Sequence, residues 1–283
     1  MTMYILFDIG ATKMRVAASF DGRSFDRRYV KIAATPKHFK DGIALLRLLA
    51  RELSEHAPRA ALRKVIGVAG GVAGSLDAKK ETIFHAPNMS KWDNRPLKKE
   101  LQRALHTKNV FLENDTALVG LGEAVRGSGK GKQIVAYITV STGINGVRIV
   151  NGEIDRSALG FEIGHQILDK NTAHTREYFA GAAALKKRYG MPAEKIHNPA
   201  VWKMAIKYLA IGIHNIILHW SPHVVVLGGG TIQSGNINAA HVEKSVNKIL
   251  TIFPKSPPIK KASLGDLGGL YGALAFLHQQ KKI

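Results

Sequence analysis

Two stretches of this chain share one pattern: an apolar run, a short turn rich in Gly, Ser or Thr, and a second apolar run. The first is LFDIGATKMRVAA, which begins at Leu6, and the second is ITVSTGINGVRIV, about 130 residues later. Each pattern predicts a β-hairpin with a tight turn. Because each hairpin opens a half that is rich in strand and helix patterns, we expect a duplicated architecture.

The rest of the chain alternates between helical and strand patterns. Helical periodicity predicts helices over 42–57, 115–125, 176–188, 200–220 and 265–282. Apolar runs predict strands that begin near 64, 110 and 222, and two of them end in glycine-rich loops. The polar segment RGSGKGKQ, residues 126–133, is a hinge candidate. Alternating elements of this kind favour an α/β fold.

The composition is that of a globular protein that is not a membrane protein. With 283 residues, of which 45% are hydrophobic and 22% charged, the chain can form one large domain or two packed lobes. It has no run of 18 uncharged apolar residues, and Asp8 interrupts the first apolar stretch, so we expect neither a membrane span nor a signal peptide. The absence of cysteine excludes disulfides and thiolate metal sites. We therefore expect a cytoplasmic location.

The net charge of +20 is the unusual feature of the composition. A charge of this size is compatible with nucleic acid, an anionic membrane or strongly anionic substrates as partners. The basic residues come in scattered pairs, without a basic arm or a zinc finger, so a solvated basic surface is the favoured interpretation. This pattern disfavours nucleic acid binding.

The glycine-rich turns are suited to hold phosphate. Glycines let backbone N–H groups approach an anion, and Thr12, Ser141 and Thr142 add hydroxyl donors. Asp8, at a strand end beside the first turn, can hold a hydrated Mg²⁺, and the glycines at 228–230 could lie against a base or ribose. Each turn alone can equally be ordinary hairpin chemistry. The sequence has no Walker loop.

Polar residues in otherwise apolar segments suggest a site for a polyol. Asp115 comes where an apolar run meets a helix, so it can be an N-cap alone or a catalytic carboxylate. Glu177 alone fits the first turn of a helix, and His165 alone fits a buried structural histidine. Taken with Asn114 and Glu162, these side chains could grip a sugar by paired hydrogen bonds.

The whole chain resembles the ROK sugar kinases (repressor, open reading frame, kinase) of the actin/hexokinase/Hsp70 ATPase superfamily. The resemblance runs from position 5 to about 275 through motifs in the family's order: DIGATKMRVA, GVAGGVAGSLD, APNMSKW, LENDTALVGLGEA, TVSTGINGVRIVNGEI, GFEIGH and VVVLGGG. It implies an α/β, two-lobed ribonuclease-H-like (actin-like ATPase) fold with the active site in the interlobe cleft. The lobes are expected at 1–118, with a closing helix at 270–283, and at 119–269.

The resemblance also implies roles for individual residues. Asp115 is expected to be the general base toward the hydroxyl of the sugar that attacks ATP, and O6 is the expected hydroxyl. The expected sugar contacts are Gly74, Asn88, Asn114, Glu162, His165 and Glu177, together with Asp115. The expected contacts to ATP are Asp8, Gly10, Thr12 and Lys13 in the first phosphate loop, Thr142 and Gly143 in the second, and Gly229 and Gly230 beside adenosine. Asp8 would hold Mg²⁺ through water.

The chain departs from the family pattern in two places. Family members commonly carry a zinc site with a histidine at the position of His165 and a cysteine loop before the next glutamate. Here only QILDKNTAHTR separates His165 from Glu177, so we expect no structural zinc, with His174 as a poor substitute ligand. The second departure is Asn145, which replaces a glycine and either crowds the second phosphate loop or makes a hydrogen bond.

Other functions compete with a kinase. A family repressor would carry a DNA-binding helix-turn-helix, whereas this chain has three residues before its first strand. A catalytically inactive sugar sensor or nucleic-acid-binding protein is the alternative. The family phosphorylates glucose, mannose, fructose, N-acetylglucosamine and N-acetylmannosamine, and the motifs do not choose among them. Family members commonly form homodimers, and we expect one here.

Overall fold

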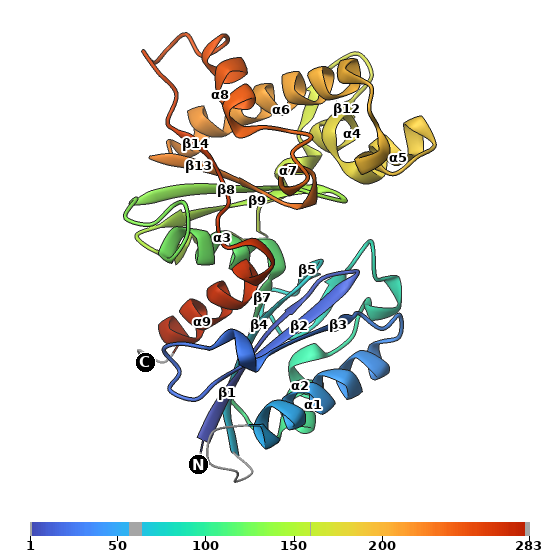
Figure 1. Ribbon diagram of the computed structural model, residues 1–283, viewed down its shortest axis with the longest axis vertical. Coiled ribbons are helices and arrows are strands. Elements are labelled where there is room, and N and C mark those ends of the chain that lie inside the picture. Colours follow the sequence, from blue (N-terminus) through green and yellow to red (C-terminus); the bar gives the residue numbers. More distant parts are fainter. Residues whose placement is uncertain (1, 57–63, 159, 281–283) are drawn as a thin grey trace. The chain divides into compact units, whose positions relative to one another are not determined.

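The computed structural model describes residues 2–56, 64–158 and 160–280. The chain divides into two compact units, Met1–Gly122 with Asp266–Ile283, and Glu123–Gly265. Each unit has one five-stranded sheet and its own helices (Figure 1). Residues 281–283 of the expected closing helix lie outside the described residues.

The first unit is built on the sheet β3-β2-β1-β4-β7. Its strands are β1 (Thr2–Ile9), β2 (Lys13–Ser19), β3 (Val30–Ala34), β4 (Lys64–Val72) and β7 (Val110–Asn114), and a small pair is formed by β5 (Ser75–Leu76) and β6 (Ile83–His85). β1 and β2 form the predicted hairpin, and β4 and β7 run parallel to β1. The parallel strands β1, β4 and β7 therefore end at one edge of the sheet, where loops can gather a site.

Helices cover this sheet. They are α1 (Phe39–Glu55), α2 (Leu97–Leu105), α3 (Asp115–Val125) and α9 (Gly268–Gln280), with short 3₁₀ turns at Arg27–Tyr29, Ser90–Trp92 and Gly265–Leu267. Figure 1 shows α1 and α2 beside the sheet, and their apolar residues share a core with alternate residues of β1. α9 packs on β1 and β4, and a Cβ at Gly272 would collide with the carbonyl of Leu118 in α3. Glycine therefore permits a close approach of α3 and α9.

The second unit repeats the strand order of the first, as β10-β9-β8-β13-β14. Its strands are β8 (Ile134–Val140), β9 (Ile144–Val150), β10 (Glu153–Ile154), β13 (Val224–Gly228) and β14 (Ile259–Lys261), with a separate pair, β11 (Ile167–Asp169) and β12 (His174–Thr175). β8 and β9 form the second predicted hairpin, and β13 runs parallel to β8. The duplicated architecture that the two hairpins predict is therefore present in the sheets.

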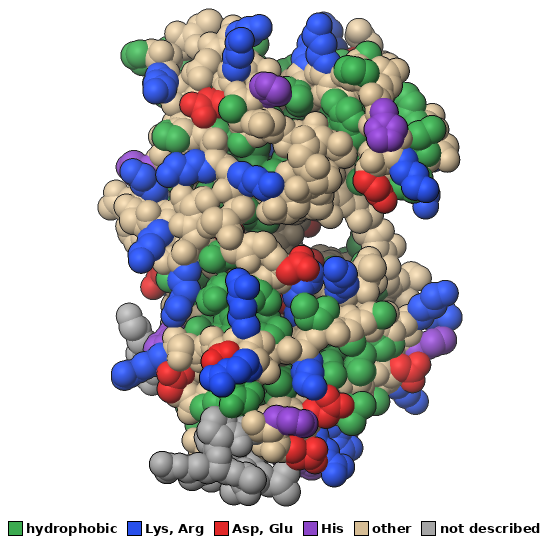
Figure 2. Space-filling view, in the orientation of Figure 1, with side chains coloured by type: hydrophobic (Ala, Val, Ile, Leu, Met, Phe, Trp, Pro, Cys, Tyr) green, Lys and Arg blue, Asp and Glu red, His purple; other side chains and the backbone are tan. Residues whose placement is uncertain are grey.

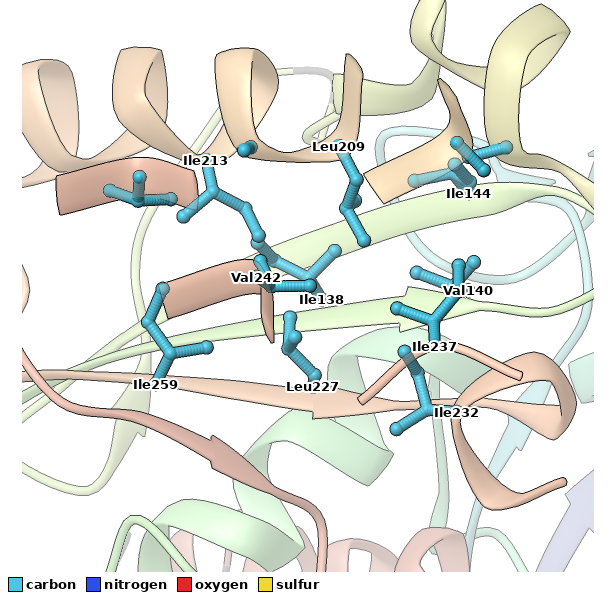
Figure 3. Packing of buried hydrophobic residues seen from close by; sticks show 14 of the residues in the cluster. Ile138, Val140, Ile144, Leu209, Ile213, Leu227, Ile232, Ile237, Val242 and Ile259 are labelled. Carbon is cyan, nitrogen blue, oxygen red and sulfur yellow. The ribbon is translucent and has the colours of Figure 1, made fainter. Parts of the chain in front are cut away.

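Helices of the second unit bury one face of its sheet. They are α4 (Arg176–Ala180), α5 (Ala182–Tyr189), α6 (Pro199–Trp220), α7 (Gly230–Gln233) and α8 (Ala239–Asn247), with 3₁₀ turns at Ile163–His165 (η3) and Ala193–Lys195. The predicted helix over 176–188 is divided at Gly181, whose backbone is extended. Figure 3 shows Leu209 and Ile213 of α6 packed toward Ile138 and Leu227 of the sheet.

α6 is the one helix in the described part of the chain that is long and apolar enough to cross a membrane by length and composition. Half of its apolar window is buried inside the unit, and its buried residues belong to the core that Figure 3 shows. A central core helix has this composition for the same reason that a membrane helix does, since both are surrounded by apolar atoms.

The basic side chains do not form one continuous patch on the face in Figure 2, where Lys and Arg are scattered among Asp, Glu and uncharged groups. This distribution is the one that the scattered basic pairs in the sequence predict. It gives a charged, solvated surface on this face.

Candidate functional site

The first unit brings its predicted catalytic residue to the end of β7. Asn114 is the last residue of β7, and the half-buried Asp115 is the first of α3. The side-chain oxygen of Asn114 accepts a hydrogen bond from the Ala117 N–H at 3.2 Å, and its amide donates to the Gly74 carbonyl at 3.0 Å. Asn114 therefore caps the helix and ties it to the loop of Gly74.

The carboxylate of Asp115 has a different local partner. Its Oδ1 accepts from the Thr116 N–H at 2.7 Å. The N-cap role that the sequence offered to Asp115 thus belongs to Asn114, one residue earlier. Asp115 lies in the positive field at the start of a helix, which stabilises its ionised form.

Of the other two expected sugar contacts in the first unit, Gly74 contacts Asn114, whereas, in the part of the chain that the structure describes, Asn88 does not. Gly74 has a φ of +109°, and a Cβ there would lie 2.5 Å from the carbonyl oxygen of His85, so only glycine fits. Its carbonyl is bound by Asn114, as described above. Asn88 is exposed in a turn that precedes the 3₁₀ turn at Ser90–Trp92, and the structure shows no contact that joins it to Asn114 or Asp115 within the described residues.

Asp8 lies buried at the end of β1, opposite Arg15 across the hairpin. Arg15 Nη1 donates to Asp8 Oδ2 at 3.0 Å, and Arg15 Nη2 donates to Asp266 Oδ1 at 3.2 Å. Burial, and then the negative charge of Asp115, raise the pKa of Asp8 to about 7, although Arg15 acts in the opposite direction. Two carboxylates therefore share one small region of this unit.

The turn after Asp8 is short and open. The Gly10 N–H donates to the Lys13 carbonyl at 3.0 Å, and Thr35 Oγ1 donates to the Gly10 carbonyl at 2.7 Å. Thr12 and Lys13 are exposed, and Lys13 Nζ lies 3.8 Å from a carboxylate oxygen of Asp266. The predicted first phosphate loop is thus a hairpin turn held from both sides, with its hydroxyl and ammonium groups facing solvent.

The second unit gathers Glu177 and the turn between β8 and β9. Glu177 Oε2 accepts from the Ile144 N–H at 2.9 Å, and a Cβ on Gly143 would lie 2.6 Å from the same oxygen. The N–H groups of Ala182 and Ala183 donate to the carbonyls of Ser141 and Thr142, at 2.8 and 2.9 Å. The start of α5 therefore fixes the predicted second phosphate loop, and Glu177 braces it.

Glu162 immediately precedes the 3₁₀ turn η3, and His165 is the last residue of that turn, which lies beside Glu177. Loss of solvent raises the pKa of Glu162, the charge of His165 and a hydrogen bond from Asn145 lower it, and the charge of Glu177 raises it further. Three of the expected sugar contacts, Glu162, His165 and Glu177, therefore lie near enough for their charges to interact. Asn145, whose role the sequence left open, donates a side-chain hydrogen bond to Glu162.

The third glycine-rich turn, at the end of β13, lies beside the second. Gly229 has a φ of +91°, and a Cβ there would collide with the carbonyl of Val140 at the end of β8. The nearest atom to a Cβ on Gly230 is Ser141 Oγ, at 3.7 Å. Gly229 thus permits the close approach of two strand ends, and Gly230 leaves room beside the loop of Thr142 and Gly143.

No group of three or more His, Asp or Glu side chains suited to hold a metal ion occurs among the described residues. His174, the possible substitute ligand, instead stacks on the Tyr178 ring with centroids 3.5 Å apart.

Three residues bond to the expected site residues or to one another, although the sequence assigned them no contact role: Arg15 bonds to Asp8 and to Asp266, and Asn145 bonds to Glu162. Arg15 could have been found, because a tight turn at 10–13 places it opposite Asp8.

The ROK family model matches residues 4–280. This chain belongs to the ROK family. It is 28% identical over 308 residues to an N-acetyl-D-glucosamine kinase of Histophilus somni, covering 96% of this chain and 98% of the relative. It is 26% identical over 249 residues to a glucokinase of Thermotoga maritima, covering 74% and 78% of the two chains. Both relatives are named as sugar kinases, and they support a phosphotransferase as the enzyme class.

Solved ROK structures share the fold. The ROK hexokinase of Thermus thermophilus superposes with a TM-score of 0.80 at 26% identity, covering 99% of both chains. A ROK glucokinase of Streptomyces griseus in complex with glucose and AMPPNP has a TM-score of 0.78 at 22% identity, covering 98% of this chain and 99% of that one. The predicted family and the predicted α/β, two-lobed actin-like fold class are both confirmed.

Proposed function

We propose that this ROK protein is an ATP-dependent kinase of a hexose or N-acetylhexosamine, with Asp115 as the general base and O6 of the sugar as the acceptor. The observation that carries the proposal is the placement of two carboxylates in one unit: Asp8 at the end of β1, beside a phosphate-loop-like hairpin, and Asp115 at the start of α3, near enough for its charge to raise the pKa of Asp8. Such a pair serves phosphoryl transfer, in which one carboxylate orients the nucleophile and the other supports a metal near the phosphates. The names of the relatives support the sugar class.

Asp115 is suited to act as the base because Asn114 already caps the helix. The carboxylate is held by the Thr116 N–H through Oδ1. In the proposed reaction it accepts the proton of the sugar hydroxyl as that oxygen attacks the γ-phosphorus of ATP and the bond to ADP breaks. Asn114 and Gly74, which are bonded to each other, would contact the sugar beside it, and Asn88 would reach it from the neighbouring loop.

The group in the second unit would hold the other hydroxyls of the sugar. Glu177 Oε2 accepts a hydrogen bond from the Ile144 N–H, and this bond fixes the orientation of the carboxylate. Glu162 and His165 can add an acceptor and an imidazole. We infer that these three side chains bind the sugar without a zinc ion.

The phosphates would be held by the glycine-rich turns. Gly10, Thr12 and Lys13 would contact them from one hairpin, Thr142 and Gly143 from the other, and Gly229 and Gly230 would lie against adenosine. Asp8 is a buried carboxylate whose Oδ2 already accepts a hydrogen bond from Arg15, and its pKa is nevertheless raised by burial and by the charge of Asp115, so a further cation would relieve the repulsion between the two carboxylates. When bound, Mg²⁺ would neutralise charge on the phosphates, and Asp8 would hold it through water.

An ADP-release assay with Mg-ATP and a panel of hexoses and N-acetylhexosamines tests the function. We expect turnover with one or two sugars, and its loss in Asp115→Ala. Asp41→Ala, which removes an exposed carboxylate in the first turn of α1, is the matched control and should keep turnover. Melting-temperature shifts with sugars but no turnover would instead favour a catalytically inactive sugar sensor.

A homodimer and a cytoplasmic location stay predictions from the resemblance and the composition. Nucleic acid binding remains the weaker alternative, because the basic residues are scattered along the chain rather than clustered in one segment.

A further inference from the structure

A cavity of about 230 Å³ that is partly open to solvent lies in the second unit, between α6 and the segment that carries η3, β11 and α4. Its walls are apolar at Ile163, Ile216 and Trp220 and polar at Gln166, Arg176, Asn215 and His219. None of these residues has a role in the proposed phosphoryl transfer. The cavity is therefore a feature that the kinase reaction leaves unexplained.

Arg176 is the unusual member of this lining. Its side chain is 1% exposed, and its Nη2 donates to Gln166 Oε1 and, at 2.9 Å, to the Gly212 carbonyl. Nε and Nη1 are buried without a hydrogen-bond partner in the described structure. Burial, with no carboxylate acting against it, lowers the pKa of Arg176 to about 10. A buried guanidinium without a counter-charge is costly unless something supplies one.

The other polar groups of the cavity have donors to spare. Gln166 Oε1 is used by Arg176, which leaves the Gln166 amide N–H groups. Asn215 Oδ1 pairs with His214 Nδ1 at 3.1 Å, which leaves the Asn215 amide N–H groups. Because the side-chain oxygens of Gln166 and Asn215 already accept hydrogen bonds, these two side chains offer mainly N–H donors to the cavity.

α6 presents part of this lining as one stripe. Asn215, Ile216 and His219 line the cavity, and Gly212 lies on the same helix face, because the four residues are spaced i, i+3, i+4 and i+7. A Cβ on Gly212 would collide with the guanidinium, so this glycine makes room for Arg176. The sequence thus accommodates a buried cation beside a cavity, where an apolar side chain would pack at lower cost.

We propose that this cavity binds a small oxyanion, of the size of inorganic phosphate or a short carboxylate, with Arg176 as its counter-charge. The donors of Gln166 and Asn215 would complete its hydrogen bonds, and Ile163, Ile216 and Trp220 would form the apolar part of the wall around it. A cavity of about 230 Å³ holds such an ion with a few waters but is below the usual size of sites for drug-sized ligands. The proposal does not depend on the kinase activity.

Calorimetric titration of the whole protein with inorganic phosphate, at ionic strength held constant with chloride, tests this site. The glycine-rich turns can also bind phosphate, so the comparison is with Arg176→Leu, which leaves those turns intact. Arg103→Leu removes an exposed arginine of α2 and is the matched control for charge. We expect Arg176→Leu to weaken one phosphate-binding event at least tenfold and Arg103→Leu to leave it unchanged.

Two further measurements keep the test decisive. Asn215→Leu keeps the shape of the side chain but removes its amide donor while Arg176 stays, so it should also weaken that binding event even if Arg176→Leu folds poorly. Titration with acetate in place of phosphate separates the two ion classes. Binding of both ions that depends on Arg176 indicates a general oxyanion site, and binding of phosphate alone restricts the site to phosphate. The proposal is overturned if neither ion binds, or if both variants bind phosphate as the wild type does.

Discussion

At the scale of single residues, the junction of β7 and α3 divides two tasks between neighbours. The sequence left open whether Asp115 caps the helix or acts in catalysis. Asn114 accepts the Ala117 N–H and binds the Gly74 carbonyl, and so it satisfies the helix end and positions the loop. Asp115 is thereby held at the helix start without the capping role. The sequence shows that Asn114 and Asp115 are both of the residue types that cap helices. Which of the two accepts the capping hydrogen bond depends on the backbone geometry, which the sequence does not show.

Asp115→Asn is the most direct test at this scale. It keeps the shape of the side chain and its bond to the Thr116 N–H, but it cannot accept the proton of the sugar hydroxyl. We expect kcat to fall by about 10²–10⁴-fold, with sugar affinity and melting temperature near those of the wild type. Steady-state kinetics and calorimetry with the sugar measure both. Near-normal kcat would rule out Asp115 as the base.

The raised pKa of Asp8 leads us to expect that the stability of the protein depends on pH. Its pKa is raised from 3.8 to about 7, so the folded state holds the proton more tightly than the unfolded state. The stability that this group contributes is complete below pH 3.8 and is lost as pH rises through about 7. Asp8→Asn removes that loss. Its melting temperature relative to the wild type should therefore increase from pH 4 to pH 8, when measured without divalent cations.

The exposed Asp41 supplies the control for this titration, since Asp41→Asn should show no such trend. An equal effect of Asp8→Asn at both pH values would contradict the assignment of a raised pKa to Asp8.

At the scale of elements, the two hairpins and most helices could be predicted from periodicity. Alternation and turn residues identify each hairpin locally, and the 3.6-residue repeat identifies helices such as α1 and α3. The break of the helix over 176–188 at Gly181 was missed. Gly181 packs against the Glu177 side chain, and the carbonyl of Ser141 accepts a hydrogen bond from the N–H of Ala182, the first residue of α5. A contact with a loop so distant in sequence is not encoded in local periodicity.

Glu123 is an element-scale anchor that the sequence did not reveal. Its side chain is 1% exposed, and its carboxylate accepts the N–H groups of Ser128, Ser263 and Leu264 at 2.8–2.9 Å. It therefore joins the end of α3 to a segment about 140 residues further along the chain. Buried backbone donors need such an acceptor.

Glu123→Ala should destabilise the protein by about 3 kcal/mol, because it leaves three backbone N–H groups without their acceptor. Urea unfolding followed by circular dichroism measures the loss. Glu194→Ala, at an exposed position, is the control and should change stability little. A loss no larger than that of the control would show that solvent replaces the carboxylate.

At the scale of the whole molecule, the net charge of +20 allowed several partners. The motifs and the family match favour a phosphotransferase, and Figure 2 shows scattered basic groups on the face in view. The order of the motifs along the chain carried the family prediction, whereas the cavity at Arg176 had no sequence signal. Its cause is the burial of one arginine against α6, which depends on the packed fold.

A whole-molecule prediction follows for nucleic acid. Binding to a random DNA duplex should be weak and should disappear as salt rises from 50 to 200 mM, the range over which non-specific phosphate contacts lose their affinity. A gel-shift titration at both salt concentrations measures it. Tight, salt-resistant binding would favour a nucleic-acid partner over the proposed kinase.

The central claim is sugar phosphorylation with Asp115 as the base, and one plate tests it most directly. ADP release is measured for the wild type, Asp115→Ala and Asp41→Ala with Mg-ATP and each hexose and N-acetylhexosamine. We predict sugar-dependent ADP release by the wild type and the Asp41 variant, and almost none by the Asp115 variant. No sugar-dependent release by the wild type, or equal release by all three proteins, would contradict the account.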